Sequence, residues 1–172
     1  MKTEYLLNRE VEHVLAALTP ANRLAMRVCL HTGLRVGDVL SLRTEQLKPR
    51  FWVHEQKTGK ARIVGLPASL LDDLRKQAGA VYVFEGRKDF RTHRTRQAVW
   101  ADVKRAAKAF RLPQNVAPHS FRKVYAVRLL EQYGDIEKVR RALNHSSVMV
   151  TYIYAMADEL LRAKFRKRRR RP

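Results

Sequence analysis

The chain has 172 residues with a hydrophobic share of 45%, which suits one domain with a real core and excludes a disordered protein. It carries 36 Lys and Arg against 16 Asp and Glu, and the resulting net charge of +20 predicts a polyanionic partner. The sequence has no apolar run long enough to span a membrane, no secretion signal and a single cysteine, Cys29, so we expect a protein of the reducing cytoplasm without a disulfide or a membrane partner.

The first part of the chain has the apolar spacing of helices. Apolar residues recur at helical intervals over 4–18 and predict a first helix. Thr19 is a candidate N-cap for a second helix over 20–31, because a proline follows it at the first helical position. Gly33 breaks this helix, and a short helix follows over 36–42.

The middle of the chain changes its hydrophobic period. Two strands are expected over 51–55 and 61–66, on either side of the turn 57–60. A third short strand is possible over 81–84. These segments predict one small antiparallel hairpin.

Helical spacing dominates after the hairpin. Helices are expected over 68–78, 94–110, 119–132, 136–142, 148–156 and 158–166. Gly134 is expected to end one of these helices, and Asp135 to cap the next. The fold class is therefore α+β, mainly α. We expect one domain over 1–161 and a basic tail over 162–172, which holds eight Lys or Arg and no acidic residue.

A few polar side chains stand out as candidates for chemistry. They are Arg35, Lys57, His119, Arg122, His145 and Tyr154. Taken alone, each is more simply a surface charge, a loop or capping histidine, or a packing tyrosine. Arg35, however, follows a glycine turn at the start of a short helix, where backbone N–H groups can bind an anion. Asp38 lies on the same helical face and could hold its guanidinium.

The other candidates suit work on a phosphate. Lys57 is expected at the tip of the hairpin, where a mobile ammonium can donate a proton to a leaving alkoxide. His119 and Arg122 lie three residues apart, which places an imidazole and a bidentate phosphate ligand on one face of a helix's first turn. The sequence has no metal-binding spacing and no nucleotide-binding glycine loop, so we expect neither a metal nor another cofactor.

Taken in chain order, these segments resemble the catalytic domain of the tyrosine recombinases, the phage-integrase family. The matching strings are His31-Thr-Gly-Leu-Arg35-Val-Gly-Asp38-Val-Leu, Glu55-Gln-Lys57-Thr-Gly-Lys60, His119-Ser-Phe-Arg122, Leu143-Asn-His145-Ser-Ser and Tyr154. The resemblance covers nearly all of residues 3–160. Tyr154 lies nine residues after His145, the interval that the family uses, which favours Tyr154 over Tyr152 as the functional tyrosine.

The resemblance implies site-specific cutting and rejoining of DNA strands without metal or ATP. Tyr154 would attack a backbone phosphate, form a 3′-phosphotyrosyl link and free a 5′-hydroxyl. Arg35 and Arg122 would bind the charge that gathers on the non-bridging oxygens. His119 would act as the base for the phenol, Lys57 would protonate the 5′-oxygen, and His145 would hydrogen-bond a non-bridging oxygen.

Two features depart from the family pattern. Most full-length members carry an additional N-terminal domain that clamps the DNA, so this chain is either an isolated catalytic fragment or a small one-domain recombinase, similar to the bacterial fimbrial-switch invertases. Asn144 stands where glycine is commoner, and asparagine tolerates the left-handed backbone expected there. After Tyr154, the segment 158–165 could pack on a neighbouring subunit, whereas 166–171 is more simply a DNA-contacting arm.

The implied partner is double-stranded DNA. We expect a homotetramer on synapsed sites, a monomer or weak dimer when free, and a bacterial, phage or mobile-element setting. Two alternatives stay open, a catalytically silent DNA-binding regulator with the same fold and an RNA-associated structural protein. The residues expected to contact DNA are Lys60, Arg62, Arg94, Arg96, Lys104, Arg105, Lys108 and Lys123.

Overall fold

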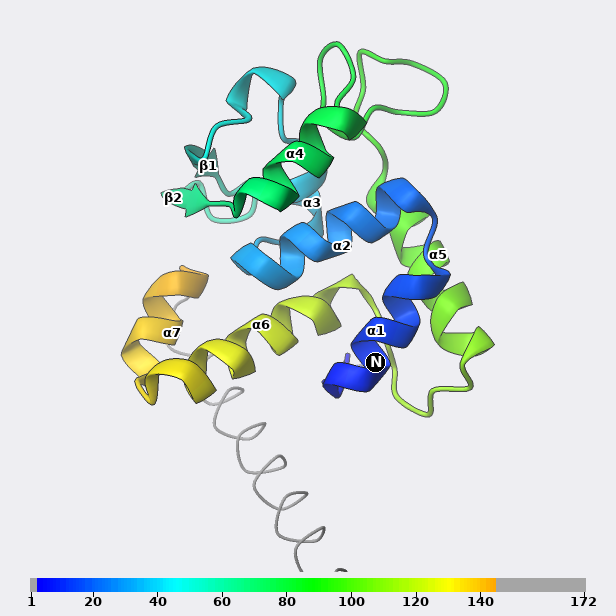
Figure 1. Ribbon diagram of the computed structural model, residues 1–172, viewed down its shortest axis with the longest axis vertical. Coiled ribbons are helices and arrows are strands. Elements are labelled where there is room, and N and C mark those ends of the chain that lie inside the picture. Colours follow the sequence, from blue (N-terminus) through cyan, green and yellow to red (C-terminus); the bar gives the residue numbers. More distant parts are fainter. Residues whose placement is uncertain (1–2, 145–172) are drawn as a thin grey trace, which may run out of the picture. The chain divides into compact units, whose positions relative to one another are not determined.

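The computed structural model describes residues 3–144, which divide after Tyr125 into two compact units. Figure 1 shows the helices and strands along the chain. The expected helices over 148–156 and 158–166, and the expected boundary between 161 and 162, lie outside the described residues. None of the helices that the structure describes is both long and apolar enough to cross a membrane.

The first unit is mostly helical, as its periodicity predicted. Its helices are α1 (Asn8–Ala17), α2 (Pro20–Thr32), α3 (Val36–Leu40), α4 (Ala68–Gln77), α5 (Arg96–Ala109) and the first part of α6 (Pro118–Tyr133), with a 3₁₀ turn at Thr44–Gln46. In Figure 1, α2 lies between α1 and α4, and it contacts both of them as well as α3. The mainly helical α+β class is confirmed.

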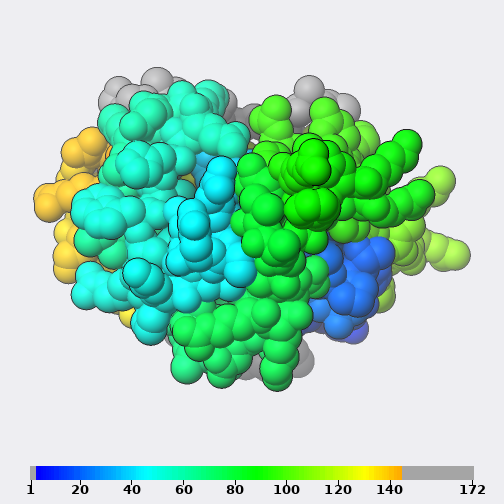
Figure 2. All heavy atoms as spheres, turned by 90° about the horizontal axis from the view of Figure 1, so that it is seen from above, coloured from blue at the N-terminus to red at the C-terminus, as the bar shows by residue number. Residues whose placement is uncertain are grey.

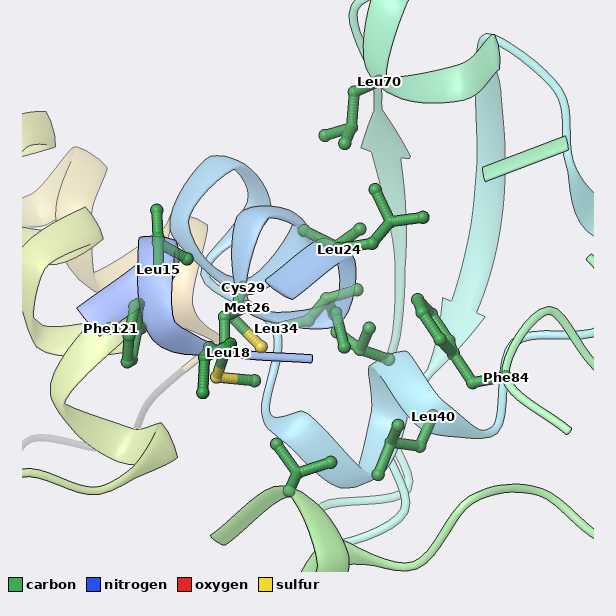
Figure 3. Packing of buried hydrophobic residues seen from close by; sticks show 14 of the residues in the cluster. Leu15, Leu18, Leu24, Met26, Cys29, Leu34, Leu40, Leu70, Phe84 and Phe121 are labelled. Atoms are coloured by element: carbon green, nitrogen blue, oxygen red, sulfur yellow. The ribbon is translucent and has the colours of Figure 1, made fainter. Parts of the chain in front are cut away.

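The hydrophobic core surrounds α2. Met26 and Cys29 on this helix are fully or almost fully buried, and Leu34 follows them in the loop after the helix. Figure 3 shows these side chains at the centre of the packing, with Leu15 of α1 and Phe121 of α6 beside them. Because α2 is buried by its neighbours, the loop at its C-terminal end is held in a fixed place, and that loop carries Arg35.

The antiparallel hairpin consists of β1 (Arg50–His54) and β2 (Ala61–Gly65). Phe51 and Val53 are buried, whereas the alternate residues of β1 are exposed, so one face of the hairpin packs on the core. The possible third strand over 81–84 is not formed. That segment makes only isolated pairing with the segment after α3, through the bridge between Arg43 and Tyr82. Figure 2 shows the two segments side by side on the surface, in cyan and green.

Local capping explains how two helices begin. The expectation that the first helix starts at residue 4 was wrong, because the Leu7 N–H donates to the Glu10 carboxylate (2.7 Å) and α1 begins at Asn8. Thr19 is the N-cap of α2, as expected, but its hydroxyl donates to Asp102 of α5 (2.9 Å) and does not cap the helix itself. The Asp102 carboxylate therefore fastens the start of α2 to α5.

The second unit consists of the end of α6 and of α7 (Ile136–Leu143). Gly134 has a left-handed backbone (φ 63°) after α6, and Asp135 caps α7 by accepting hydrogen bonds from the N–H groups of residues 137 and 138. Asn144 has φ 55° at the end of α7, so the left-handed backbone expected there is confirmed.

Candidate active site

Arg35 is positioned by the turn that ends α2. Gly33 adopts a left-handed backbone (φ 66°), and its N–H donates to the Cys29 carbonyl (2.9 Å), which closes the helix. The chain then reverses, and Arg35 becomes the N-cap residue of α3. A residue with a Cβ is strained at this φ, so the glycine is needed to bring Arg35 close behind a buried helix.

The guanidinium of Arg35 is held by Glu55 and not by Asp38. Arg35 Nη1 lies 2.5 Å from Glu55 Oε2, and the glutamate side chain is completely buried. The Asp38 carboxylate instead accepts the Gln56 N–H (3.0 Å). Burial raises the pKa of Asp38. The strand alternation that buries Phe51 and Val53 continues to Glu55, and this was the signal in the sequence that marked Glu55 as an inward-facing residue.

Arg122 reaches the same loop from α6. Its side chain is almost fully buried, and its guanidinium donates to the Gly33 carbonyl. Burial, and then the positive charge of Arg35, lower the pKa of Arg122 to about 10. The group is still protonated at neutral pH. Two residues that are 87 positions apart in the sequence (122 − 35) therefore meet on either side of one turn.

His119 lies on α6 one turn before Arg122 and keeps an exposed edge. Partial desolvation lowers the pKa of its imidazole to about 4, with further contributions from the charges of Arg122, Lys123, Arg35 and Lys57. The direction of this shift leaves the ring neutral at pH 7, where it can accept a proton. Arg122, Arg35 and Lys57 therefore all affect the charge state of His119.

We expect the His119 ring to titrate well below the ordinary histidine value in the free protein. The unfolded chain binds the proton more readily, so the contribution of this ring to folding stability is complete above about pH 6.5 and is lost as the pH falls toward 4. NMR titration of the ring protons measures the midpoint. A midpoint for His119 near 6.5 would contradict this environment.

Lys57 lies at the exposed tip of the hairpin, as predicted. The tip is a closed turn, because the Glu55 carbonyl accepts hydrogen bonds from Thr58 N (3.2 Å) and Gly59 N (2.8 Å). Gly59 has φ 67°, a backbone conformation that suits glycine. The lysine therefore stands on a turn that is anchored at its base by Glu55.

The remaining two candidates, His145 and Tyr154, lie outside the described residues. The described part of the site therefore contains Arg35, Lys57, His119 and Arg122.

Some side chains expected to contact DNA point into the protein. Arg62 is partly buried, donates to the Thr32 carbonyl (3.0 Å) and lies 3.3 Å from Glu55. Lys123 is only 6% exposed, and its ammonium donates to the Thr3 carbonyl. Both expectations treated these residues as surface charges, whereas packing turns them inward. We therefore leave them out of the DNA-contacting surface.

The other basic residues are more accessible. Lys60 and Arg96 are exposed, at the hairpin tip and the start of α5, whereas Arg94 is half-buried. Lys104 donates to Asn115 (2.5 Å), and Arg105 pairs with Asp102 (2.6 Å). The basic face of α5 is therefore partly used for internal contacts, whereas Lys60, Arg96 and Lys108 are exposed and accessible to a phosphate.

A hollow of about 450 Å³ opens beside His119. Arg96 and the half-exposed Trp100 of α5 line it, together with Pro118 and Val36, the residue after Arg35. A cation and an aromatic face at this hollow suit a nucleic-acid strand passing next to the candidate phosphate site.

Comparison with known proteins identifies the family of the chain. The model of the Phage integrase family matches residues 4–160. The chain belongs to this family. The predicted resemblance to this family is thus confirmed, and Arg35, Lys57, His119 and Arg122 all lie inside the matched range.

Two curated relatives are similar along most of the chain. A tyrosine recombinase of Thermosipho africanus is 27% identical over 168 residues, which cover 91% of the chain and 58% of the relative. The tyrosine recombinase XerD of Lacticaseibacillus casei is 31% identical over 154 residues, which cover 79% and 50%. The chain therefore spans only about half the length of the curated relatives it matches.

Solved structures share the fold. The XerA recombinase has a TM-score of 0.74 at 24% identity, with 100% of the chain and 67% of that structure covered. The catalytic domain of the bacteriophage HP1 integrase has a TM-score of 0.67 at 24% identity, with 90% and 88% covered. A lambda integrase dimer bound to a core site has a TM-score of 0.73 at 22% identity, with 89% and 59% covered.

Proposed function

We propose that this integrase-family chain is the catalytic part of a site-specific DNA recombinase that works through a 3′-phosphotyrosyl intermediate. The observation that carries the proposal is the meeting of Arg35 and Arg122 at one turn, with His119 and Lys57 close enough to act on each other electrostatically. Binding DNA requires positive charge alone. A protonated pair of arginines beside a neutral imidazole is an arrangement suited to phosphoryl transfer.

The two arginines supply the charge that the transition state needs. Attack on a phosphodiester places extra negative charge on the non-bridging oxygens, and guanidinium groups bind such oxygens in a bidentate way. Arg122 is held in place by burial and by the Gly33 carbonyl, so the group is oriented before substrate arrives. Arg35 is 19% exposed and faces Glu55, which leaves it accessible to a phosphate at the surface.

His119 and Lys57 serve the two proton transfers. The neutral imidazole of His119 accepts the phenol proton as Tyr154 attacks the phosphorus. Lys57 donates a proton to the 5′-oxygen as the bond between the phosphorus and that oxygen breaks. A 5′-hydroxyl from a second duplex reverses both steps and joins the strands. The bond energy is kept in the phosphotyrosyl link, so the scheme uses neither metal nor ATP. In this scheme His145 donates a hydrogen bond to a non-bridging oxygen.

We propose double-stranded DNA as the partner, with a homotetramer on two synapsed sites. The charge of +20 and the exposed Lys60 and Arg96 support DNA binding. Among the similar structures, a lambda integrase dimer and the XerH recombinase are described as bound to their DNA sites. A cytoplasmic setting in a bacterium, phage or mobile element stays a prediction, as does the domain boundary between 161 and 162.

The test uses a library of nicked duplexes with randomised sequence. A recombinase cleaves some members next to the nick, the short strand diffuses away, and an SDS-resistant protein–DNA adduct accumulates. Sequencing the captured DNA then identifies the preferred site. A chain that retains duplexes but gives no adduct would favour the alternative function, a catalytically silent DNA-binding regulator. Preference for RNA over duplex DNA would instead favour the RNA-associated alternative.

Replacing Lys57 with alanine should slow cleavage by about 10²- to 10⁴-fold, the usual range for losing a general acid. A substrate with sulfur at the 5′-bridging position should restore most of the rate, because a thiolate leaves without a proton. Lys60→Ala is the control, since it removes another exposed lysine from the same turn, and any loss through weaker DNA binding should be the same on the oxygen and the sulfur substrate. Single-turnover adduct formation measures both. Equal slowing on the oxygen and the sulfur substrate would contradict the role of Lys57.

A further inference from the structure

The carboxylate of Glu55 is a buried charge that the proposed reaction does not use. Its side chain has no exposed surface, although glutamate is among the residues least often buried. An unpaired buried carboxylate is strongly unfavourable, so the groups that surround it must be held next to it. Those groups come from the two parts of the candidate site that carry Arg35 and Lys57.

One oxygen of Glu55 joins Arg35 to the hairpin tip. Oε2 accepts Arg35 Nη1 at 2.5 Å and the Thr58 hydroxyl at 3.1 Å. Thr58 follows Lys57 directly, and its backbone N–H also donates to the Glu55 carbonyl. A single side chain therefore contacts both the guanidinium beside α3 and the turn that carries the lysine.

The other oxygen, Oε1, faces Arg62 on β2. Arg62 Nε lies 3.3 Å from it, and Arg62 Nη2 donates to the Thr32 carbonyl at 3.0 Å. Thr32 begins the turn that leads into Arg35. The hairpin is thus attached to this turn twice, through the Arg35 side chain and through the backbone before it.

Glu55 also offsets repulsion among the arginines. Its negative charge raises the pKa of Arg122 and that of Arg62, against the lowering that burial causes in both. Because it is fully buried, the carboxylate does not compete with a phosphate at the surface. Glu55 therefore lies buried behind the candidate site, where it holds Arg35 without being exposed to substrate.

We propose that Glu55 is a positioning residue that fixes the Arg35 guanidinium relative to the Lys57 turn before DNA binds. This inference rests on the proposed recombinase function for its catalytic consequence, whereas the hold on Arg35 itself is independent of that function. Asp38 has a separate task, since its carboxylate accepts the Gln56 N–H.

The hold on Arg35 is measured without DNA. Phenylglyoxal reacts with accessible guanidinium groups, and peptide mass spectrometry locates the modified arginines. We expect Glu55→Gln to raise the labelling rate of Arg35 several-fold and to leave that of Arg27 unchanged. Asp73→Asn is the matched control, because Asp73 pairs with Arg27 at 2.6 Å away from the site, and it should raise the labelling of Arg27 alone. Unchanged labelling of Arg35 in Glu55→Gln would overturn the proposal.

Glu55→Asp covers the case in which Glu55→Gln does not fold. Aspartate keeps the buried negative charge, but it is one methylene shorter and does not hold Arg35 at the same place. Its Arg35 labelling should also rise. Wild-type labelling of Arg35 in Glu55→Asp would overturn the proposal, because a buried negative charge would then hold Arg35 whatever the exact place of the carboxylate.

The catalytic consequence is that the Glu55 variants should lose cleavage rate and keep their affinity for DNA. On the DNA selected by the wild-type chain, both Glu55 variants should cleave about 10- to 100-fold more slowly, the usual result of a misplaced catalytic group. DNA affinity should change little, since it is set by many phosphate contacts. Wild-type or faster cleavage would overturn the positioning role. Absence of any adduct with the wild-type chain would instead refute the proposed function, while the labelling result would still test the hold on Arg35.

Discussion

Tyr154→Phe is expected to abolish the covalent protein–DNA adduct and to leave DNA binding intact. The phenol oxygen is the atom that forms the bond to phosphorus, and phenylalanine keeps the ring without that oxygen. Because no other group in the proposed mechanism replaces it, the loss should be complete and not a graded change. Adduct formation on the nicked library, resolved on a denaturing gel, measures this effect.

Tyr152→Phe is the matched control, since it removes the same oxygen two residues earlier. We expect it to form the adduct at a rate close to that of the wild-type chain, because only Tyr154 has the nine-residue interval from His145. The reverse result, with the adduct lost in Tyr152→Phe and kept in Tyr154→Phe, would identify Tyr152 as the nucleophile.

Arg122→Met should slow cleavage by about 10²- to 10³-fold, the usual cost of losing one group that stabilises developing negative charge. Its effect on folding should be small by comparison. Burial and the charge of Arg35 already lower the pKa of Arg122 to about 10, which means that the charged form is unfavourable in this environment. Methionine fills a similar volume without charge. The removal of a buried charge offsets the loss of the hydrogen bond to the Gly33 carbonyl, so we expect the free energy of unfolding to change by only about 1 kcal/mol.

Arg122→Ala separates packing from charge. The side chain of Arg122 is 1% exposed, so alanine leaves a cavity, in addition to the loss of the hydrogen bond to the Gly33 carbonyl that both variants share. We expect a loss of about 3 kcal/mol in the free energy of unfolding, with a cleavage defect like that of the methionine variant. Urea unfolding and single-turnover cleavage measure the two effects. A methionine variant that cleaves at the wild-type rate would contradict the role given to Arg122.

Local sequence signals predicted most of the fold. The helices and the hairpin follow from hydrophobic period, and Gly134, Asp135 and Asn144 act at their boundaries as expected. Two details depended on contacts that periodicity does not encode. The Glu10 carboxylate accepts the Leu7 N–H, so the first helix begins later in the sequence than its apolar spacing suggested. Residues 81–84, a possible strand, pair with the segment after α3 at a single bridge.

The candidate site was predicted through the order of its motifs and not through any one residue. Arg122 contacts the turn that leads into Arg35, and the charges of Arg122, Arg35 and Lys57 all act on His119. The partner of Arg35 was missed, because Asp38 is its neighbour in sequence whereas Glu55 meets it only after the hairpin folds back. The inward direction of a basic side chain such as Lys123 also depends on tertiary packing, which charge alone does not reveal.

Mass spectrometry of the protein–DNA adduct is the most direct test of the whole account, because it reports the reacting residue and the reacting end of the DNA together. We expect a digested peptide that contains Tyr154 and carries a nucleotide through its 3′-phosphate, with a free 5′-hydroxyl on the released strand. A nucleotide attached to another residue, or joined through a 5′-phosphate, would contradict it.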